Sequence, residues 1–223
     1  MKRIILLAVL VVSACQSKPQ TVKPANNSTI ASTDVPTEEF LISAAGIGKA
    51  KLGMTVGQLK QICDRDTKFE IVPSFYLDSS AIAVSQDGLT QYYILYPAGT
   101  TSHPDRSTPT DNDPIIWLMT DNHNYQTEEG VKVGTLIAEA EDIYGDAVLS
   151  HNFEGKPGEY VIFEDENSEN IFFKASYFQP ISDGLGYSGI YPKYPGVSFT
   201  TDKYRSDAAI AAIEVSCSRE ECF

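Results

Sequence analysis

An internal match within the sequence constrains the fold more than any other feature. Residues 51–62 and residues 132–143 align without gaps at an offset of 81 residues. Both segments read as an apolar residue, a glycine, and then two to three helical turns with apolar positions at helical spacing. Thr55 in the first copy and Thr135 in the second are candidate N-cap residues. The match therefore predicts a duplicated unit.

Strand-like runs follow each helix candidate in the same order. Residues 90–96 correspond to residues 169–177 at nearly the same offset, and both runs are rich in β-branched and aromatic residues. Each run lies between an earlier and a final strand candidate, at 81–84 and 115–120 in the first copy and at 159–163 and 209–215 in the second. The pattern predicts an α+β fold of two tandem repeats, each a short helix plus an antiparallel β-meander, with the sheet packed on helices.

The Gly turn Leu52-Gly53-Met54-Thr55, with its helix and meander, is similar to a known fold. It resembles the beta-lactamase-inhibitor-protein-like fold, which includes small outer-membrane lipoproteins of the SmpA/OmlA type. The resemblance covers residues 46–216 as two copies. It implies protein–protein recognition across the sheet faces and long loops, with loops 97–113 and 179–206 as contact elements.

The N-terminus reads as a lipoprotein signal. Lys2 and Arg3 precede the apolar run 4–12, which is too short for a membrane span of about 20 residues. The following Ser13-Ala14-Cys15 resembles the bacterial lipobox, in which the cysteine is diacylated and becomes the first residue of the mature chain. The alternative is an ordinary signal peptide with a chance cysteine. Gln16, where Asp would retain a lipoprotein in the inner membrane, favours the outer membrane, facing the periplasm.

These features predict four segments along the chain. Residues 1–14 are the signal peptide, and residues 15–37, rich in Ser, Thr, Asn and Pro, form a lipidated flexible tether. Residues 38–124 and 125–223 are the two helix-plus-meander repeats. The expected membrane contact is through the lipid on Cys15 alone.

The charge of the chain excludes nucleic acid as the expected partner. There are 17 Lys and Arg against 30 Asp and Glu in 223 residues, and the basic residues are scattered singly. From residue 38 onward, 13 bases stand against 29 acids, so the folded part carries a formal charge of −16. Such a field would steer a basic protein partner.

Three cysteines remain once Cys15 is lipidated, and the exported compartment permits disulfides. The favoured pairing is Cys217 with Cys222, which enclose a four-residue loop. A bridge from Cys63 to one of them remains open. Cys63 lies on the apolar side of the first helix candidate, where a cysteine acts as a small hydrophobe.

The sequence holds no catalytic motif, so no catalytic residue, metal or cofactor is expected. G-x-S-x-G, H-E-x-x-H and the phosphate-binding P-loop are all missing from it. His103 and His123, with Asp105, Asp111 and Asp113, are of the right type for a metal site, but their spacing does not select one. A small metal-dependent hydrolase is therefore kept only as an alternative.

Aromatic residues concentrate near the C-terminus, between residues 177 and 204. The partner-binding candidates are Tyr187, Tyr191, Tyr194, Phe199 and Tyr204. Tyrosines on a Gly- and Pro-rich loop offer a large contact area at low entropic cost. The same rings could equally close over the sheet as a cover for the core.

The function expected from the sequence is a non-enzymatic envelope lipoprotein that acts as a protein-binding or scaffold module. A second hypothesis, motivated by the charge, is an inhibitor or immunity protein against a cationic enzyme such as lysozyme or a toxin.

Overall fold

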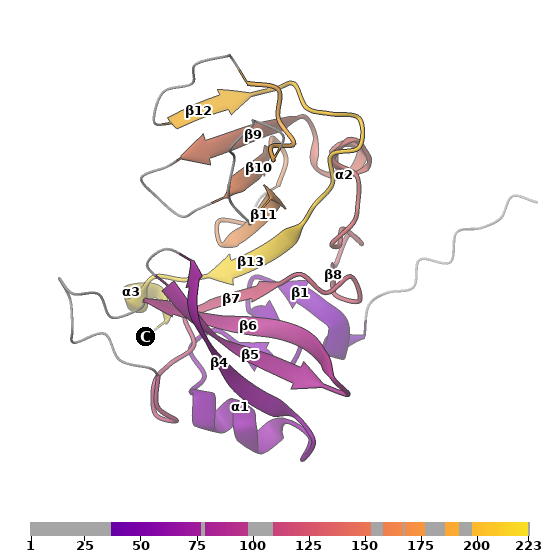
Figure 1. Cartoon of the computed structure of the whole chain (residues 1–223). Helices are drawn as coiled ribbons and strands as arrows, with labels where there is room; N and C mark the ends of the chain where they lie inside the picture. Colours follow the sequence, from indigo (N-terminus) through magenta and orange to yellow (C-terminus); the bar gives the residue numbers. More distant parts are fainter. Residues whose placement is uncertain are drawn as a thin grey trace, which may run out of the picture. The chain divides into compact units, whose positions relative to one another are not determined.

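The main element of the fold is one nine-stranded antiparallel sheet (Figure 1). The structure, a computed structural model, describes residues 37–76, 79–97, 109–152, 158–166, 168–176, 186–191 and 198–222. The strands lie in the order β12 (Ser198–Thr201), β9 (Ala147–Asn152), β10 (Glu159–Phe163), β11 (Ile171–Ser176), β13 (Ala212–Ser216), β7 (Trp117–Thr120), β6 (Leu89–Pro97), β5 (Ser79–Gln86) and β4 (Lys68–Tyr76). We call β4 to β7 the first half of the sheet and β9 to β13 the second half.

A four-stranded sheet accompanies the large one. Its order is β3 (Ala50–Lys51), β2 (Gly46–Ile47), β1 (Leu41–Ser43) and β8 (Gln126–Thr127), with β1 and β8 parallel. A 3₁₀ turn, η1 (Glu38–Phe40), leads into β1, and a four-residue helix, α3 (Arg219–Cys222), ends the described chain. None of the four short strands was predicted from the sequence.

The predicted α+β fold of two helix-plus-meander repeats packed on helices is wrong, because the protein is mostly β. The last strands of the two predicted repeats, β7 and β13, pair with each other, so one sheet runs through both. The helices α1 (Val56–Ile62) and α2 (Ile137–Tyr144) have seven and eight residues. Each is about 10–12 Å long, whereas nine strands span roughly 40 Å. Two such helices cannot form the layer on which this sheet packs.

The two matched segments nevertheless make the same backbone hydrogen bond just before their helices begin. Gly53 N donates to Ile115 O, and Gly134 N donates to Ile210 O, both at 2.8 Å. Each acceptor lies on the segment that leads into a central strand, β7 or β13. The sequence match therefore marks two equivalent helix entries beside the centre of the sheet.

The two helix starts differ in their caps. Thr55 caps α1: its side chain accepts from Gln58 N at 3.1 Å, and Gln58 Oε1 accepts from Thr55 N at 2.8 Å. For α2 the predicted cap, Thr135, is wrong. Leu136 is the N-cap residue, and the Thr135 hydroxyl instead accepts from Lys132 N at 3.1 Å in the preceding turn.

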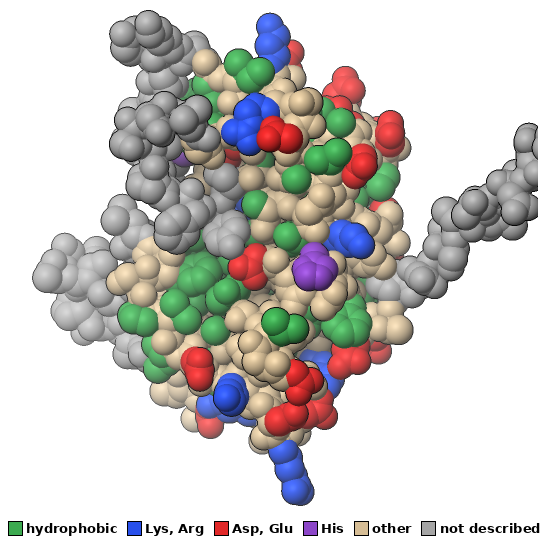
Figure 2. All heavy atoms as spheres, turned by 45° about the vertical axis from the view of Figure 1, so that its right-hand side comes forward, with side chains coloured by type: hydrophobic (Ala, Val, Ile, Leu, Met, Phe, Trp, Pro, Cys, Tyr) green, Lys and Arg blue, Asp and Glu red, His purple; other side chains and the backbone are tan. Residues whose placement is uncertain are grey.

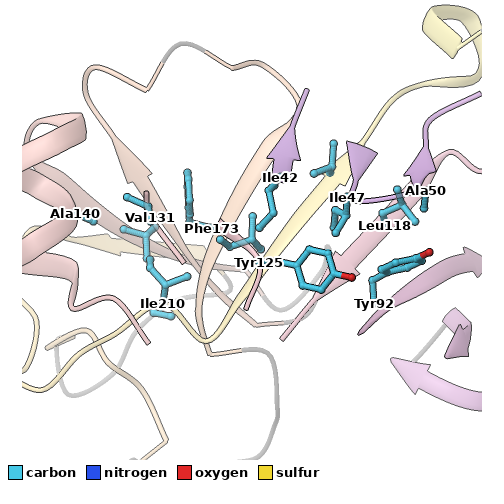
Figure 3. Close-up of a cluster of buried hydrophobic side chains, with 14 of the residues drawn as sticks. Ile42, Ile47, Ala50, Tyr92, Leu118, Tyr125, Val131, Ala140, Phe173 and Ile210 are labelled. Carbon is cyan, nitrogen blue, oxygen red and sulfur yellow. The ribbon is translucent and has the colours of Figure 1, made fainter. Parts of the chain in front are cut away.

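The main hydrophobic core lies on one face of the large sheet, which we call the core face (Figure 3). Alternate strand residues point to it, as the two-residue period of a strand requires. The small sheet contributes Ile42, Ile47 and Ala50, which pack with Leu118 from β7. The helices add Val56 and Leu59 from α1 and Ile137, Ala140 and Tyr144 from α2. The opposite face, which we call the second face, carries the side chains considered next.

Candidate interaction face

A buried ion pair lies at the centre of the second face. Lys174 on β11 and Glu214 on β13 are both fully buried, and Lys174 Nζ lies 2.9 Å from Glu214 Oε1. Lys174 Nζ also donates to the Tyr76 hydroxyl at 3.0 Å, and that hydroxyl lies 3.1 Å from Glu214 Oε1. The Tyr160 hydroxyl donates to Glu214 Oε2 at 3.4 Å. The pair is therefore held by two tyrosines from opposite halves of the sheet.

Burying two charges is costly, and the surroundings of this pair offset the cost. The Lys174 ammonium lies 4.5 Å from the ring centre of Tyr76 and 4.8 Å from that of Tyr160, so both rings stabilise its charge. Burial raises the pKa of the Tyr160 hydroxyl, and the Glu214 carboxylate adds to the increase. Tyr160 therefore stays a hydrogen-bond donor. Breaking one partner of such a pair leaves an uncompensated charge in the interior.

The end of the β4–β5 hairpin folds over the first half of the second face. The pairing of β4 with β5 is interrupted by a bulge between Val72 and Tyr76, and Ser74 has φ +52°. Beyond the bulge, Phe75 packs against Tyr93 of β6 with ring centres 4.7 Å apart. Tyr76 reaches across β7 to Glu214 on β13. Residues 73–76, here called the hairpin tip, thus close this half of the face.

The second half of the same face is open. Ile162 on β10 is 56% exposed, and Val148, its registered partner on β9, is 37% exposed. The half-buried Phe172 lies opposite Ile162 on β11, the next strand on the other side. This follows from the register, in which Tyr160 pairs with Lys174 and Val161 with Phe173. These three apolar side chains lie on neighbouring strands on one side of the sheet, because residues in register point the same way.

One row of registered residues crosses the whole second face and allows the halves to be compared. From the central pair, Glu214 and Met119, it runs outward through Phe172, Ile162 and Val148 on one side, and through Tyr93, Ala83 and Glu70 on the other. Where the first half has Ala83 and Glu70, the second half has Ile162 and Val148. The row therefore carries exposed branched apolar residues in the second half and not in the first.

Two exposed acidic residues lie at one end of the open half. Asp146 precedes Val148 by two residues, and Glu164 follows Ile162 by two residues. Both acids are exposed, and they lie opposite each other, since Glu164 N donates to Asp146 O. Residues 125–223 hold 18 acids and 7 bases, whereas residues 38–124 hold 11 acids and 6 bases. Figure 2 shows acidic side chains spread over the surface, gathered toward its upper right and its lower end. The open apolar residues thus belong to the more acidic part of the chain.

The aromatic candidates lie at the far end of the second half and are partly buried. His151 of β9 stacks on Phe199 of β12 with ring centres 5.2 Å apart, and its Nε2 lies 3.1 Å from the Tyr187 hydroxyl. Tyr191 and Tyr204 pack against the main core. Tyr194 lies outside the described residues. Four of the five predicted partner-binding residues therefore make contacts within the fold.

A buried carboxylate holds this aromatic segment to the sheet. Glu159 is fully buried; it accepts from Ser188 N and Gly189 N at 2.8 Å each and from the Tyr191 hydroxyl at 2.7 Å. The Tyr204 hydroxyl donates to Glu141 of α2 at 2.7 Å. Burial and the nearby carboxylate raise the pKa of Tyr204 to about 12. Sequence reasoning missed Glu159, although a lone acid at the start of an apolar strand run is a signal for a buried partner.

Cys217 and Cys222 are joined by a disulfide, and Cys63 is a free thiol. Cys63 ends α1 and lines a hollow of about 190 Å³ beside Lys49, Tyr92 and Tyr125. Burial raises the pKa of the Cys63 thiol, which keeps it in the unreactive protonated form. The predicted lipidation site, Cys15, lies outside the described residues.

The residues of the alternative metal site are separate in the structure. Asp111 is exposed and pairs with Lys60 at 2.7 Å, while Asp113 accepts from the Thr110 backbone at 2.6 Å within its own turn. His123 is exposed, and His103 and Asp105 lie outside the described residues. Within the described part of the chain, no group of three His, Cys, Asp or Glu side chains is arranged to hold a metal ion.

No helix among the described residues is both long and apolar enough to cross a bilayer. No protein-family model matches the sequence, and no curated protein matches it. Among solved structures, that of the uncharacterized protein yfeY from Escherichia coli matches this chain. The similarity covers 79% of this chain and 99% of that one, with a TM-score of 0.45 and 14% sequence identity.

Proposed function

We propose that the chain is a non-enzymatic lipoprotein of the bacterial envelope that binds another protein, either as a scaffold or as an adaptor. The Cys15 lipobox would anchor it to the outer membrane, and the folded part would face the periplasm. The observation that carries the binding proposal is the exposed pair Ile162 and Val148 on the open half of the second face.

This pair supports a binding role because both side chains are exposed on neighbouring strands. Single exposed apolar residues are normal, but neighbouring ones on adjacent strands indicate an interaction surface. The first half of the sheet places Ala83 and Glu70 at the corresponding row positions, so the exposed branched pair is specific to the second half.

Site-specific crosslinking in living cells tests the binding proposal. A photoreactive phenylalanine analogue at position 162 of the full chain should give a protein adduct. The matched control is position 71, because Ile71 is 57% exposed in β4 and its registered partner, Ile82, belongs to the main core. Adducts at 162 but not at 71 support the proposal. No adduct at 162, or equal adducts at both positions, overturns it.

The anchor is tested separately. Wild-type protein should incorporate radiolabelled palmitate and sediment with outer membranes, and the Cys15→Ala variant should do neither. A Cys63→Ala variant is the matched cysteine control and should retain the label. Palmitate on Cys15→Ala protein would overturn the anchor proposal while leaving the binding proposal intact.

A further inference from the structure

We infer that the open half of the second face binds a basic amphipathic helix of another protein. The inference rests on the proposed function and adds the chemistry of the partner. The contact surface would be Ile162 and Val148, with Asp146 and Glu164 beside them.

The shape of the surface favours a helix. A sheet face with apolar residues on neighbouring strands is commonly covered by a helix whose apolar side faces it. The core face of this same half shows such an arrangement, since α2 packs Ile137, Ala140 and Tyr144 into the core beside β9 to β11. On the second face, the described residues include no helix packed over Ile162 and Val148, both of which remain solvent-exposed.

The charges beside the surface select a basic partner. Asp146 and Glu164 continue the β9–β10 pairing one step past the strands, since Glu164 N donates to Asp146 O at 3.1 Å. Residues two apart along a strand are about 7 Å apart, so the backbone places both acids at the end of the sheet that follows the apolar pair. Neither carboxylate takes part in a salt bridge among the described residues. In β9, β10 and β11 the one Lys or Arg is Lys174, which is buried against Glu214. Lysine or arginine on the rim of a docked helix would meet both acids.

Charge also argues against two other occupants. Residues 125–223 carry 18 acids against 7 bases, so a second copy would bring two strongly acidic surfaces together. An anionic leaflet would repel the same surface. A basic helix alone matches both the apolar pair and its acidic surroundings.

A peptide of defined chemistry tests the inference. The full lipidated chain, in phosphatidylcholine nanodiscs and with the photoreactive analogue at position 162, would be mixed with an 18-residue helical peptide of leucine and lysine. The comparison peptide replaces every lysine with glutamate. Since like and unlike charges change contacts of this kind by about 1 kcal/mol each, the lysine peptide should give at least about tenfold more adduct.

The acids are tested by a matched pair of double variants. Asp146→Asn with Glu164→Gln should lower the lysine-peptide adduct by about three- to tenfold. Glu139→Gln with Asp142→Asn, which removes two exposed acids of α2, should leave it unchanged. Equal adducts with both peptides, an equal loss in both double variants, or adducts only to lipid or to a second copy of this chain would overturn the inference.

The two proposals fail in different ways. If position 162 gives a cellular adduct but no preference for the lysine peptide, a protein partner exists and its basic helical chemistry is excluded. If position 162 gives no cellular adduct, the proposed binding function itself is excluded.

Discussion

On its second face the nine-stranded sheet is closed over one half and open over the other. In the first half the hairpin tip folds back, and Tyr76 seals Met119 and Leu95 from solvent. In the second half Ile162 and Val148 remain exposed. The same row of registered residues runs through both halves, so the difference lies in what covers the row. The closed half shows how this sheet covers its second face internally, and the open half leaves two apolar side chains of that face in contact with solvent.

The buried ion pair lies in the second half beside the boundary, where Tyr76 of the first half contacts both of its members, and breaking it should have the largest effect. Lys174→Met leaves the Glu214 carboxylate buried without its cation, which should lower the free energy of unfolding by about 3–5 kcal/mol. Urea denaturation measures the change. The double variant with Glu214→Leu should recover much of the loss, because no charge is then buried alone. A loss below about 1 kcal/mol for Lys174→Met would show that the pair contributes little to the stability of the fold.

Overpacking the closed half should have the next largest effect. Ala83 is 7% exposed and in register with Tyr93, whose ring packs against Phe75 of the hairpin tip. Giving it the residue of the open half, by Ala83→Ile, adds three carbons at this buried position. We expect a destabilisation of about 1–3 kcal/mol in thermal or urea unfolding. A neutral result would mean that the hairpin tip is loosely held and that the closed half is open in solution.

Acid should weaken the second half through His151. Burial lowers the pKa of this histidine, although the nearby Glu159 opposes the shift. The unfolded chain takes up a proton near pH 6.5, whereas the folded chain resists it, so stability is full above about pH 6.5 and falls as the pH drops below it. One such group contributes at most about 1.4 kcal/mol per pH unit.

The contribution of His151 is measured by urea unfolding between pH 5 and pH 8. His151→Phe should flatten the fall below about pH 6.5, because phenylalanine keeps the stack on Phe199 without a titrating group. His123→Gln, at an exposed position, should leave the fall unchanged. An equal slope in wild type and His151→Phe would contradict the assignment.

Local patterns in the sequence predicted local structure in this protein. Thr55 and Gln58 form the capping box that their spacing suggests, and the residues 159–163 form β10. The pairing of β7 with β13 was out of reach, because no nearby residue specifies which distant strand a strand meets. Because this long-range strand pairing could not be predicted, the predicted fold class was also wrong.

The central ion pair was missed although the sequence carried a signal for it. Lys174 is the one charge in the run Ile171–Ser176, and Glu214 is the one charge in Ala212–Ser216. A single charge inside an apolar strand must find a buried partner. Which charge pairs with which depends on the pairing of β11 with β13, which cannot be read from the local sequence. The exposure of Ile162 depends on the same long-range arrangement.

The smallest effect on stability is expected at the surface that matters most for binding. The double variant Ile162→Ala with Val148→Glu gives the open half the residues that the closed half has in the same row. Because both side chains are exposed, the free energy of unfolding should change by about 0.5 kcal/mol or less. A photoreactive phenylalanine analogue at position 172, which lies beside Ile162 on β11, should then lose its cellular adduct. A cost of 2 kcal/mol or more would instead show that Ile162 and Val148 stabilise the sheet itself. In that case the contrast between an open and a closed half would carry no information about a partner.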